Sequence, residues 1–547
     1  MRPLRVYCVE GRLAAQPSVI DTKHWRKRED VVRRRWVVVF ASGAVALLGT
    51  GCSTPNTTTP KPGTTPASTS AAVPTAVPTG SWGRASEVPG LAALDTAGSA
   101  HIVSVSCDSP GNCAVGGYYT SRGYHGFVVS ETNGRWGKAI QVPGLAALDA
   151  GVFPGGGAFV VSVSCGSAGD CAAGGSYLDQ ERHDQGFVVS ESNGVWGQAI
   201  EVPGLAALNV GKDGEPGAAV NSLSCGSAGN CVAGGFYQDQ KRRSQGFVVS
   251  ESNGIWGQAI EVPGLGVLNV GAYIAEGAQV NSVSCASAGN CVAGGYNSIR
   301  SASDRVRRQA FVVSEQNGHW GTAIEVPGIA ALNAGGYAEV SSVSCASAGN
   351  CAAGGNYASI APNGNGGGHQ QGFVVSERNG VWGKAVEVPG LQALNMHGDA
   401  TVKSVSCPSP GNCAAGGNYD GDPQYGDGYG KGYVVSEKNG VWGRAIGRPG
   451  LVALNAGQFS DVESVSCASA GNCAAGGLYE DASGDGQAFV IRENNGGWGQ
   501  AMDIAGLKAL NKAGAAAVTA VACVRPAKCV AGGHYRDSRN HFHAFVT

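Results

Sequence analysis

Charged residues are scarce in this sequence. Only 14% of the 547 residues are Asp, Glu, Lys or Arg, against about a quarter in an ordinary soluble domain, which favours sheet and turns over surface helices. Glycine is abundant, with 88 residues, but it has no three-residue period, so a collagen-like structure is excluded. From Cys52 onward there are 28 Lys/Arg against 36 Asp/Glu and no basic stripe, so we expect no nucleic-acid partner.

Common catalytic motifs are also missing. The sequence has no Gly-x-Ser-x-Gly, no His-Glu-x-x-His and no phosphate-binding glycine loop. No cofactor is indicated. We therefore favour a non-enzymatic protein and keep enzymatic activity as an open alternative.

The N-terminal region has the features of an export signal. An apolar run of about 13 residues, Trp36–Leu48, follows the basic triplet Arg33–Arg35 and has the length of a signal-peptide core. Three small residues then lead to Cys52. This arrangement resembles a bacterial lipoprotein signal, which implies lipidation of Cys52 and attachment to a membrane. Because Gly49 stands where that family usually has Leu, ordinary cleavage and secretion stay open, as does a short N-terminal membrane anchor.

The chain divides into three parts. Residues 1–51 are the signal region, and because residues 1–30 are too long and too mixed in charge for a signal, we expect translation to start near residue 31. Residues 52–79 are rich in Thr, Pro and Ser and cannot bury enough apolar surface to fold, so they are predicted to be a tether. Residues 80–547 hold an internal repeat. The predicted location is extracytoplasmic.

Eight units of about sixty residues make up the third part. Their tryptophans are 54 to 64 residues apart, at Trp82, Trp136, Trp196, Trp256, Trp320, Trp382, Trp442 and Trp498. Eight cysteine pairs recur in step with them: Cys107 with Cys113, Cys165 with Cys171, Cys225 with Cys231, Cys285 with Cys291, Cys345 with Cys351, Cys407 with Cys413, Cys467 with Cys473 and Cys523 with Cys529.

Each unit contains four short strand signals. In one unit these are residues 341–345, 351–357, 372–377 and 382–389, and the last two are joined by Asn-Gly, the strongest short hairpin signal. Four antiparallel strands in a repeat of this length predict an all-β fold, an eight-bladed β-propeller. The repeats begin with a fourth strand at Trp82 and end with a third strand at Phe545, so we expect these two to pair and close the ring.

The cysteine pairs are predicted to be disulfides, one in each blade. Their six-residue offset places both cysteines across the hairpin of the first two strands, where cross-strand distances suit a disulfide. Zinc sites usually show a shorter Cys spacing with a second pair nearby, and no His accompanies these pairs. Export to an oxidising compartment supports the disulfide interpretation.

Two resemblances support the fold. The turn Ser376-Glu-Arg-Asn-Gly-Val-Trp382 resembles a degenerate Asp-box of sialidase-type propellers, with Arg378 at the Asp position. All eight units are similar to the Ser-Cys-x-Ser-x-x-x-Cys-x-Ala-x-Gly repeats of secreted bacterial lipoproteins, and this resemblance covers residues 80–547. Both resemblances imply a propeller, and neither implies a ligand.

Two further sets of residues recur with the repeat. Seven glutamates end the third strand signal, and we expect solvated edge charges or turn-capping acceptors at Glu131, Glu191, Glu251, Glu315, Glu377, Glu437 and Glu493. A second set follows a Leu and is expected to end a short turn, with a ring-shaped ion site as the alternative: Asp95, Asp149, Asn209, Asn269, Asn333, Asn395, Asn455 and Asn511.

Strand order sorts the loops by face. The turns between strands one and two and between three and four share one face and repeat closely, whereas the loops on the opposite face vary in length and charge. Varied loops on a repeated scaffold are the default binding surface. Exposed aromatic and Arg side chains dominate binding hot spots, so the predicted ligand-binding residues are Phe153, Tyr273, Tyr337, Phe459, Arg242, Arg243, Arg307, Arg308, Tyr425 and Tyr429.

Metal binding has only weak candidates. Asp420, Asp422 and Asp427 have oxygen ligands at loop spacing for Ca²⁺ but lack the full twelve-residue pattern. A second group comprises His534, Asp537, His541 and His543. The leading hypothesis is a surface-tethered binding or scaffold protein for a glycan, peptide or protein. A degenerate glycan-acting hydrolase or lyase and a purely structural envelope module are the alternatives.

Overall fold

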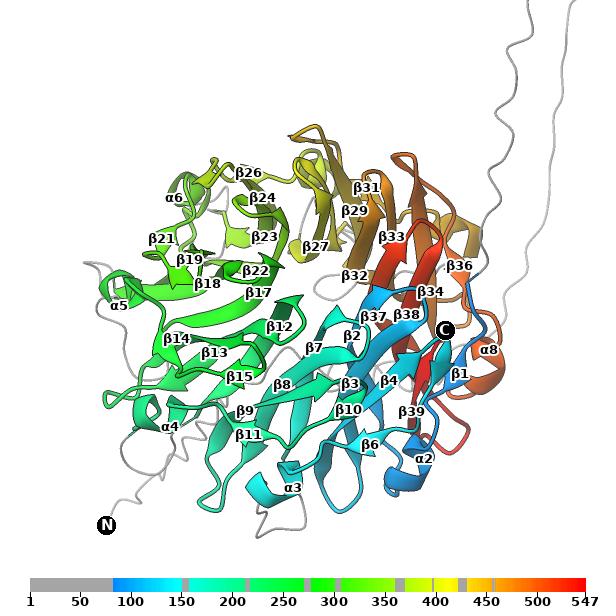
Figure 1. The fold of residues 1–547 in the computed structure, drawn as a ribbon. Helices are drawn as coiled ribbons and strands as arrows, with labels where there is room; N and C mark the ends of the chain where they lie inside the picture. The colour runs from blue at the N-terminus through cyan, green and yellow to red at the C-terminus, as the bar shows by residue number, and fades with distance from the viewer. Residues whose placement is uncertain are drawn as a thin grey trace, which may run out of the picture. The chain divides into compact units, whose positions relative to one another are not determined.

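The computed structural model describes residues 82–149, 157–211, 217–269, 277–300, 306–359, 369–395, 398–421, 430–454, 457 and 459–547. The signal region, the tether and Cys52 therefore lie outside the described residues. The repeats form an eight-bladed β-propeller in which eight antiparallel sheets surround a central axis (Figure 1). No helix in the described ranges is both long and apolar enough to cross a membrane.

The first strand of each blade lies next to the axis and contacts the first strands of both neighbouring blades. These inner strands are β2 (His101–Ser109), β7 (Phe159–Ser167), β12 (Ala219–Ser227), β17 (Gln279–Ser287), β22 (Ala338–Ser347), β27 (Thr401–Ser409), β32 (Ser460–Ser469) and β37 (Ala517–Arg525). The second strands are β3 (Asn112–Thr120), β8 (Asp170–Leu178), β13 (Asn230–Gln238), β18 (Asn290–Arg300), β23 (Asn350–Ala358), β28 (Asn412–Asp420), β33 (Asn472–Glu480) and β38 (Lys528–Arg536).

The outer half of each blade is less regular. The third strands are β4 (Tyr124–Thr132), β9 (Asp184–Ser192), β14 (Ser244–Ser252), β19 (Val306–Gln316), β24 (Gln370–Arg378), β29 (Gly430–Lys438), β34 (Gly486–Asn494) and β39 (Phe542–Val546). The fourth strand is split into two-residue pieces: β5 (Arg135–Trp136) and β6 (Ile140–Gln141), β10 (Val195–Trp196) and β11 (Ile200–Glu201), β15 (Ile255–Trp256) and β16 (Ile260–Glu261), β20 (His319–Trp320) and β21 (Ile324–Glu325), β25 (Val381–Trp382) and β26 (Val386–Glu387), β30 (Val441–Trp442) and β31 (Ile446–Gly447), and β35 (Gly497–Trp498) and β36 (Met502–Asp503).

A single helical turn follows each fourth strand. These turns are α2 (Leu91–Leu94), α3 (Leu145–Leu148), α4 (Leu205–Leu208), α5 (Leu265–Leu268), α6 (Ile329–Leu332), α7 (Leu391–Leu394), the 3₁₀ turn η1 (Leu451–Leu454) and α8 (Leu507–Leu510). As expected, the recurring Asp or Asn ends the turn, with its N–H bonded to the first residue of the helix. Its side chain is engaged between blades: Asn209 donates to Gln185 at 3.1 Å and accepts from the Gln238 N–H. Asn455 lies outside the described residues.

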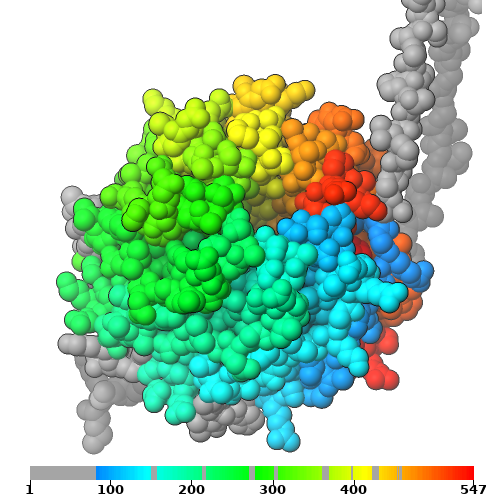
Figure 2. Space-filling view, in the orientation of Figure 1, coloured from blue at the N-terminus to red at the C-terminus, as the bar shows by residue number. Residues whose placement is uncertain are grey.

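Strand β1 (Ser86–Glu87) lies at the edge of the last blade. It pairs antiparallel with β39, with Ser86 opposite Val546 and Glu87 opposite Phe545. The N-terminal and C-terminal parts of the propeller therefore lie side by side, blue next to red (Figure 2). Trp82 itself is not in the ladder, because β39 ends at Val546 and only the second half of a fourth strand is paired in this blade.

All eight predicted disulfides are confirmed, one in each blade. They join Cys107 to Cys113, Cys165 to Cys171, Cys225 to Cys231, Cys285 to Cys291, Cys345 to Cys351, Cys407 to Cys413, Cys467 to Cys473 and Cys523 to Cys529.

Each disulfide links the inner strand of a blade to its second strand. In the first blade, for example, Cys107 lies opposite Cys113 in the ladder, and across the eight bonds the Cα atoms are 3.9 to 4.1 Å apart. The sixteen cysteines are therefore structural links inside the blades and not metal ligands. Disulfides at this density indicate a protein that folds in an oxidising, extracytoplasmic compartment.

The second strand of each blade has two consecutive glycines because a side chain at either position would clash with its surroundings. A side chain on Gly354 would meet Val402 of the next blade at 2.6 Å, and one on Gly355 would overlap the carbonyl oxygen of Glu339. The first glycine lets adjacent blades approach, and the second lets the inner strand bulge against its partner. Between blades the buried Val, Phe and Tyr side chains form one apolar cluster per seam.

Six of the seven recurring glutamates are buried and are not solvated edge charges or turn caps, so for these six the expectation is wrong, whereas Glu131 is half-buried. Glu251 is 3% exposed, and its Oε1 accepts a hydrogen bond of 2.5 Å from Ser190 of the preceding blade. Trp256 donates from Nε1 to the same hydroxyl at 3.0 Å. We call this Ser–Glu–Trp arrangement the interblade clasp. Its serine-to-glutamate bond recurs at Ser130–Glu191, Ser250–Glu315, Ser314–Glu377, Ser376–Glu437 and Ser436–Glu493.

Candidate functional site

Three positions in each blade depart from the repeat, and they share one place in the fold. The first position is the first or second residue of the inner strand: His101, Phe159, Ala219, Gln279, Glu339, Thr401, Asp461 and Ala517. The second position is its partner on the second strand: Tyr118, Ser176, Phe236, Tyr296, Asn356, Asn418, Leu478 and His534. The third is the bulged residue two places further along the inner strand: Val103, Val161, Asn221, Asn281, Ser341, Lys403, Glu463 and Thr519.

These residues, which we call the axial layer, surround the axis on one face. Inner strands begin where the loops from the preceding blade arrive, so the axial layer lies on the face of the varied loops, which we call the variable face. The opposite face holds the repeated turns, which pair with one another; for example, the Gly194 N–H donates to the Gly169 carbonyl at 2.8 Å. In the same strands the Val, Ser, Cys and Gly positions are nearly constant.

One sector of the axial layer is aromatic. His101 stacks on Tyr118 with ring centres 5.0 Å apart and contacts His534 at 4.6 Å. Phe159 contacts Tyr118 at 5.2 Å and Tyr124 at 4.9 Å. Phe542, from the third strand of the last blade, contacts both histidines. We call this series, which crosses three blades, the aromatic crescent: His534, Phe542, His101, Tyr118, Phe159 and Tyr124.

The histidines of the crescent are held neutral. Burial lowers the pKa of the His534 ring to about 4, and burial followed by the proximity of His534 lowers the pKa of His101 well below its usual value. The Nδ1 atom of His534 is buried without a hydrogen-bond partner. At neutral pH neither imidazole of this sector carries a charge, and the cation beside the sector is Arg536, whose Cζ lies 5.6 Å from the centre of the Phe542 ring.

A second sector couples a cation to two tyrosines. The Arg308 guanidinium lies 4.2 Å from the ring centre of Tyr296 and 5.1 Å from that of Tyr337. Arg308 also donates to the Tyr337 hydroxyl at 3.2 Å, and that hydroxyl donates to Glu339 at 3.0 Å. Burial raises the pKa of the Glu339 carboxyl.

A third sector is a charge cluster. Lys403 donates from Nζ to Asp461 at 2.6 Å and to Glu463 at 3.0 Å, and Asn418 donates to Asp461 at 3.3 Å. Burial raises the pKa of the Asp461 carboxyl above its ordinary value, Lys403 opposes this rise and Glu463 adds to it. The second carboxylate oxygen of Asp461, Oδ1, is buried without a hydrogen-bond partner. Two carboxyls thus face one ammonium group, and the pKa of the buried one is raised.

Only some of the predicted ligand-binding residues come together in the structure. Arg308 and Tyr337 meet in the second sector, and Arg307 beside them donates to the Asn333 carbonyl at 2.8 Å. Arg243 is engaged within its own loop, where Nε and Nη2 both bond to Asp239. Arg242 and Phe459 are half-buried in variable-face loops. Phe153, Tyr273, Tyr425 and Tyr429 lie outside the described residues.

Sequence reasoning missed most of the axial layer, because it compared loops and not strands. Aligning the eight units column by column shows that residues such as His101, Lys403 and Asp461 break a pattern that their neighbours keep. These differences between the eight units at equivalent positions were the feature of the sequence that could have identified the axial layer.

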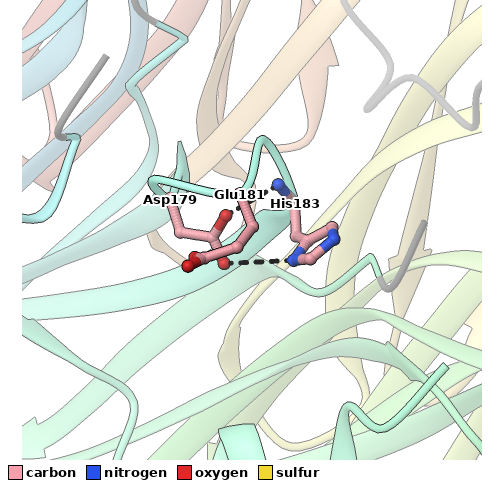
Figure 3. Close-up of side chains that lie close together, drawn as sticks. All are labelled: Asp179, Glu181 and His183. Carbon is pink, nitrogen blue, oxygen red and sulfur yellow. Dashed lines mark hydrogen bonds and ion pairs between the residues drawn. The ribbon is translucent and has the colours of Figure 1, made fainter. Parts of the chain in front are cut away.

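The metal candidates have structural roles in their loops. In the loop after β8 the groups of Asp179, Glu181 and His183 converge, and Asp179 lies 3.4 Å from the His183 ring (Figure 3). Asp179 also accepts the His183 backbone N–H at 2.8 Å and the Gln185 amide at 3.1 Å. Aspartates at the same place bind the same backbone and side-chain positions in other blades, at Asp239, Asp481 and Asp537. The aspartate therefore shapes the loop whether or not a histidine follows.

The other predicted metal groups do not assemble in the described part of the chain. His534 belongs to the aromatic crescent, whereas Asp537 bonds to the His543 ring at 3.2 Å and to the His541 backbone. Asp420 ends β28 and its N–H donates to Asn395 at 3.2 Å. Asp422 and Asp427 lie outside the described residues.

Comparison with known proteins finds only distant structural matches. No family model and no curated protein matches the chain. Among solved structures, the propeller domain of the Trilobed protease from Pyrococcus furiosus matches with a TM-score of 0.38 and 9% identity, over 74% of this chain and 98% of that one. A polysaccharide lyase of the PL25 ulvan lyase family gives 0.38 and 11%, over 73% and 91%. The NanB sialidase of Streptococcus pneumoniae gives 0.33 and 11%, over 70% and 66%. At this similarity the matches carry no argument about the fold or the activity of this chain.

Proposed function

We propose that the protein is an extracytoplasmic binding protein whose ligand, a glycan, peptide or protein, engages the variable face at the axial layer. The observation that carries this proposal is the divergence of the axial layer within strands that otherwise repeat. A purely structural role predicts the same residues from blade to blade, as the disulfides show in all eight blades and the serine-to-glutamate bond of the interblade clasp shows at six seams. A ligand without eightfold symmetry requires different residues around the axis.

We further propose that lipidated Cys52 attaches the protein to a membrane, with the Thr/Pro/Ser-rich residues 52–79 as a tether. Secretion without an anchor is the alternative. Metabolic labelling with a radioactive fatty acid separates the two, because Cys52→Ala abolishes incorporation only if this cysteine is the lipidation site.

The binding proposal is tested with the oxidised chain on glycan and peptide arrays and in pull-downs. Substitutions in each sector, Tyr124→Ala, Arg308→Ala and Lys403→Ala, are compared with Val195→Ala and Ile255→Ala, which are 70% and 74% exposed on the opposite face. We expect at least one axial substitution to weaken a ligand that the opposite-face variants bind normally. Failure to find any such ligand would favour the structural envelope module.

A second candidate function is a glycan-acting hydrolase or lyase. It is favoured by one observation: Asp461 and Glu463 form a carboxyl pair on Lys403 at the axis, and burial raises the pKa of the Asp461 carboxyl. A proton donor beside a carboxylate is what glycosidic bond cleavage requires. Release of reducing ends from array-positive glycans, lost in Asp461→Asn, would establish this activity.

A further inference from the structure

We infer that the aromatic crescent is a stacking subsite for an uncharged sugar ring, so that the ligand of the axial layer is a glycan. This inference rests on the proposed binding function and specifies its ligand class. It starts from the six rings that are in contact across the last, first and second blades.

The exposed fraction of the rings increases from the base of the crescent to its rim, as expected for a surface on which a ligand stacks. Tyr118 and His534 are each 8% exposed and form its base, whereas Tyr124 is 43% exposed at its rim. His101, Phe159 and Phe542 are half-buried between them. Rings that served only to pack the seam would be covered throughout, as Phe127 and Phe545 are in the same blades.

The polar atoms of the crescent select the ligand. His534 Nδ1 is buried and unpaired, so a hydroxyl of the ligand would supply the hydrogen bond that the protein does not. The two imidazoles are neutral at pH 7 because burial lowers both pKa values. The imidazoles therefore give no charge to pair with a phosphate or a carboxylate, and Arg536, whose Cζ lies 5.6 Å from the centre of the Phe542 ring, already has a partner within the protein. The apolar face of a pyranose ring stacks on aromatic rings, and its hydroxyls bond at their edges.

The crescent has one small side chain at each end. Ser176 is the ladder partner of Phe159, and Ala517 is the ladder partner of His534. The adjoining blades again carry larger side chains, Phe236 on one side and Leu478 on the other.

The test uses the full oxidised chain and isothermal titration with neutral linear oligosaccharides of glucose, mannose, galactose and N-acetylglucosamine, together with an acidic uronate oligomer. We expect a neutral oligosaccharide to bind and Tyr124→Ala and Phe159→Ala each to weaken it about fivefold or more. His534→Phe keeps the ring and removes Nδ1, so we expect it to weaken binding while the melting temperature stays within the range of the Tyr124 variant. Val195→Ala is the control on the opposite face.

Each other outcome overturns the inference. Binding of a neutral sugar that is unchanged in the Tyr124 and Phe159 variants would place the sugar elsewhere, and a preference for the uronate would contradict an uncharged subsite. Absence of all sugar binding, with peptides captured on an array and lost in Arg308→Ala or Lys403→Ala, would refute the glycan but keep the binding function. If no axial substitution weakens the binding of any ligand, both the glycan inference and the proposed binding function are refuted.

Discussion

The indole of Trp82 packs against the guanidinium of Arg492, whose Cζ lies 4.9 Å from the ring centre. At this position other blades have a serine that accepts from the tryptophan, as Ser436 does from Trp498 at 3.0 Å. Trp82 Nε1 is instead buried without a hydrogen-bond partner. The residues that join the beginning of the propeller to its last blades therefore differ from those at the ordinary seams.

Removal of residues 80–89 should destabilise the propeller. The deletion takes away Trp82, the β1 pairing with β39 and the buried side chain of Val88, and it exposes the edge of β39. We expect a clear drop in melting temperature, with aggregation on heating. The measurement is differential scanning calorimetry with light scattering, and an unchanged transition would show that β1 does not stabilise the ring.

Loss of one clasp hydroxyl should be costly. Ser190→Ala leaves the buried Glu251 carboxylate and the Trp256 N–H without their shared partner, so we expect a loss of about 1–3 kcal/mol in the free energy of unfolding. Ser192→Ala, two residues away and exposed, is the matched control and should change little. Urea unfolding compares the two, and equal values would mean that the clasp adds no stability.

The clasp glutamates should make stability depend on pH. Burial raises the pKa of Glu251 above its ordinary value near 4.5, so the folded state holds the proton at a pH where the unfolded chain releases it. This contribution is greatest below the unfolded pKa and is lost as pH rises through the folded pKa. Relative to Glu251→Gln, whose amide stays neutral, the wild type should therefore become less stable as pH rises above about 4.5. A constant difference from pH 4 to 8 would contradict the raised pKa.

Each disulfide should contribute modestly. Replacing Cys345 and Cys351 together by Ser opens a loop with a sequence separation of 6, for which the chain-entropy estimate is on the order of 2 kcal/mol. Chemical unfolding measures the loss. The companion experiment is a thiol count on denatured, unreduced protein. Reactive thiols from the eight cysteine pairs would contradict the eight disulfides.

Variable-face aromatics outside the crescent give a separate prediction. Tyr337→Ala removes a ring and a hydroxyl that contact Arg308, and Phe459→Ala removes a half-buried ring. If a ligand covers this part of the face, each should weaken binding by more than about 1 kcal/mol. Val381→Ala, on the opposite face, should not. A larger loss from Val381 would mean that the ligand binds the face of the repeated turns.

The fold could be predicted from the sequence because the features that define each blade lie close together in the chain. Asn-Gly turns, paired cysteines and alternating Val and Ser define the strands of each blade and their order without reference to distant residues. The glutamates were misjudged for the opposite reason. Glu251 lies at the end of a strand and looks exposed in sequence, but its partner Ser190 is 61 residues away and belongs to another blade.

The candidate site was only partly predictable. The varied loops predicted Arg308 and Tyr337, and these two residues meet in the second sector of the candidate site. Lys403 and Asp461 are 58 residues apart in sequence, and their contact depends on the stacking of two blades about the axis. The pairing of strands within one unit does not show which residues of adjacent blades come into contact.

The interblade clasp does not determine how many blades the ring contains. Its serine-to-glutamate bond is the same at six seams, so the clasp of a duplicated unit of sixty residues would find a complementary neighbour on either side. Contacts that occur once, such as Trp82 with Arg492 and Lys403 with Asp461, belong to particular seams. Such a scaffold is suited to change by duplication, after which the axial residues of the new copy are free to diverge.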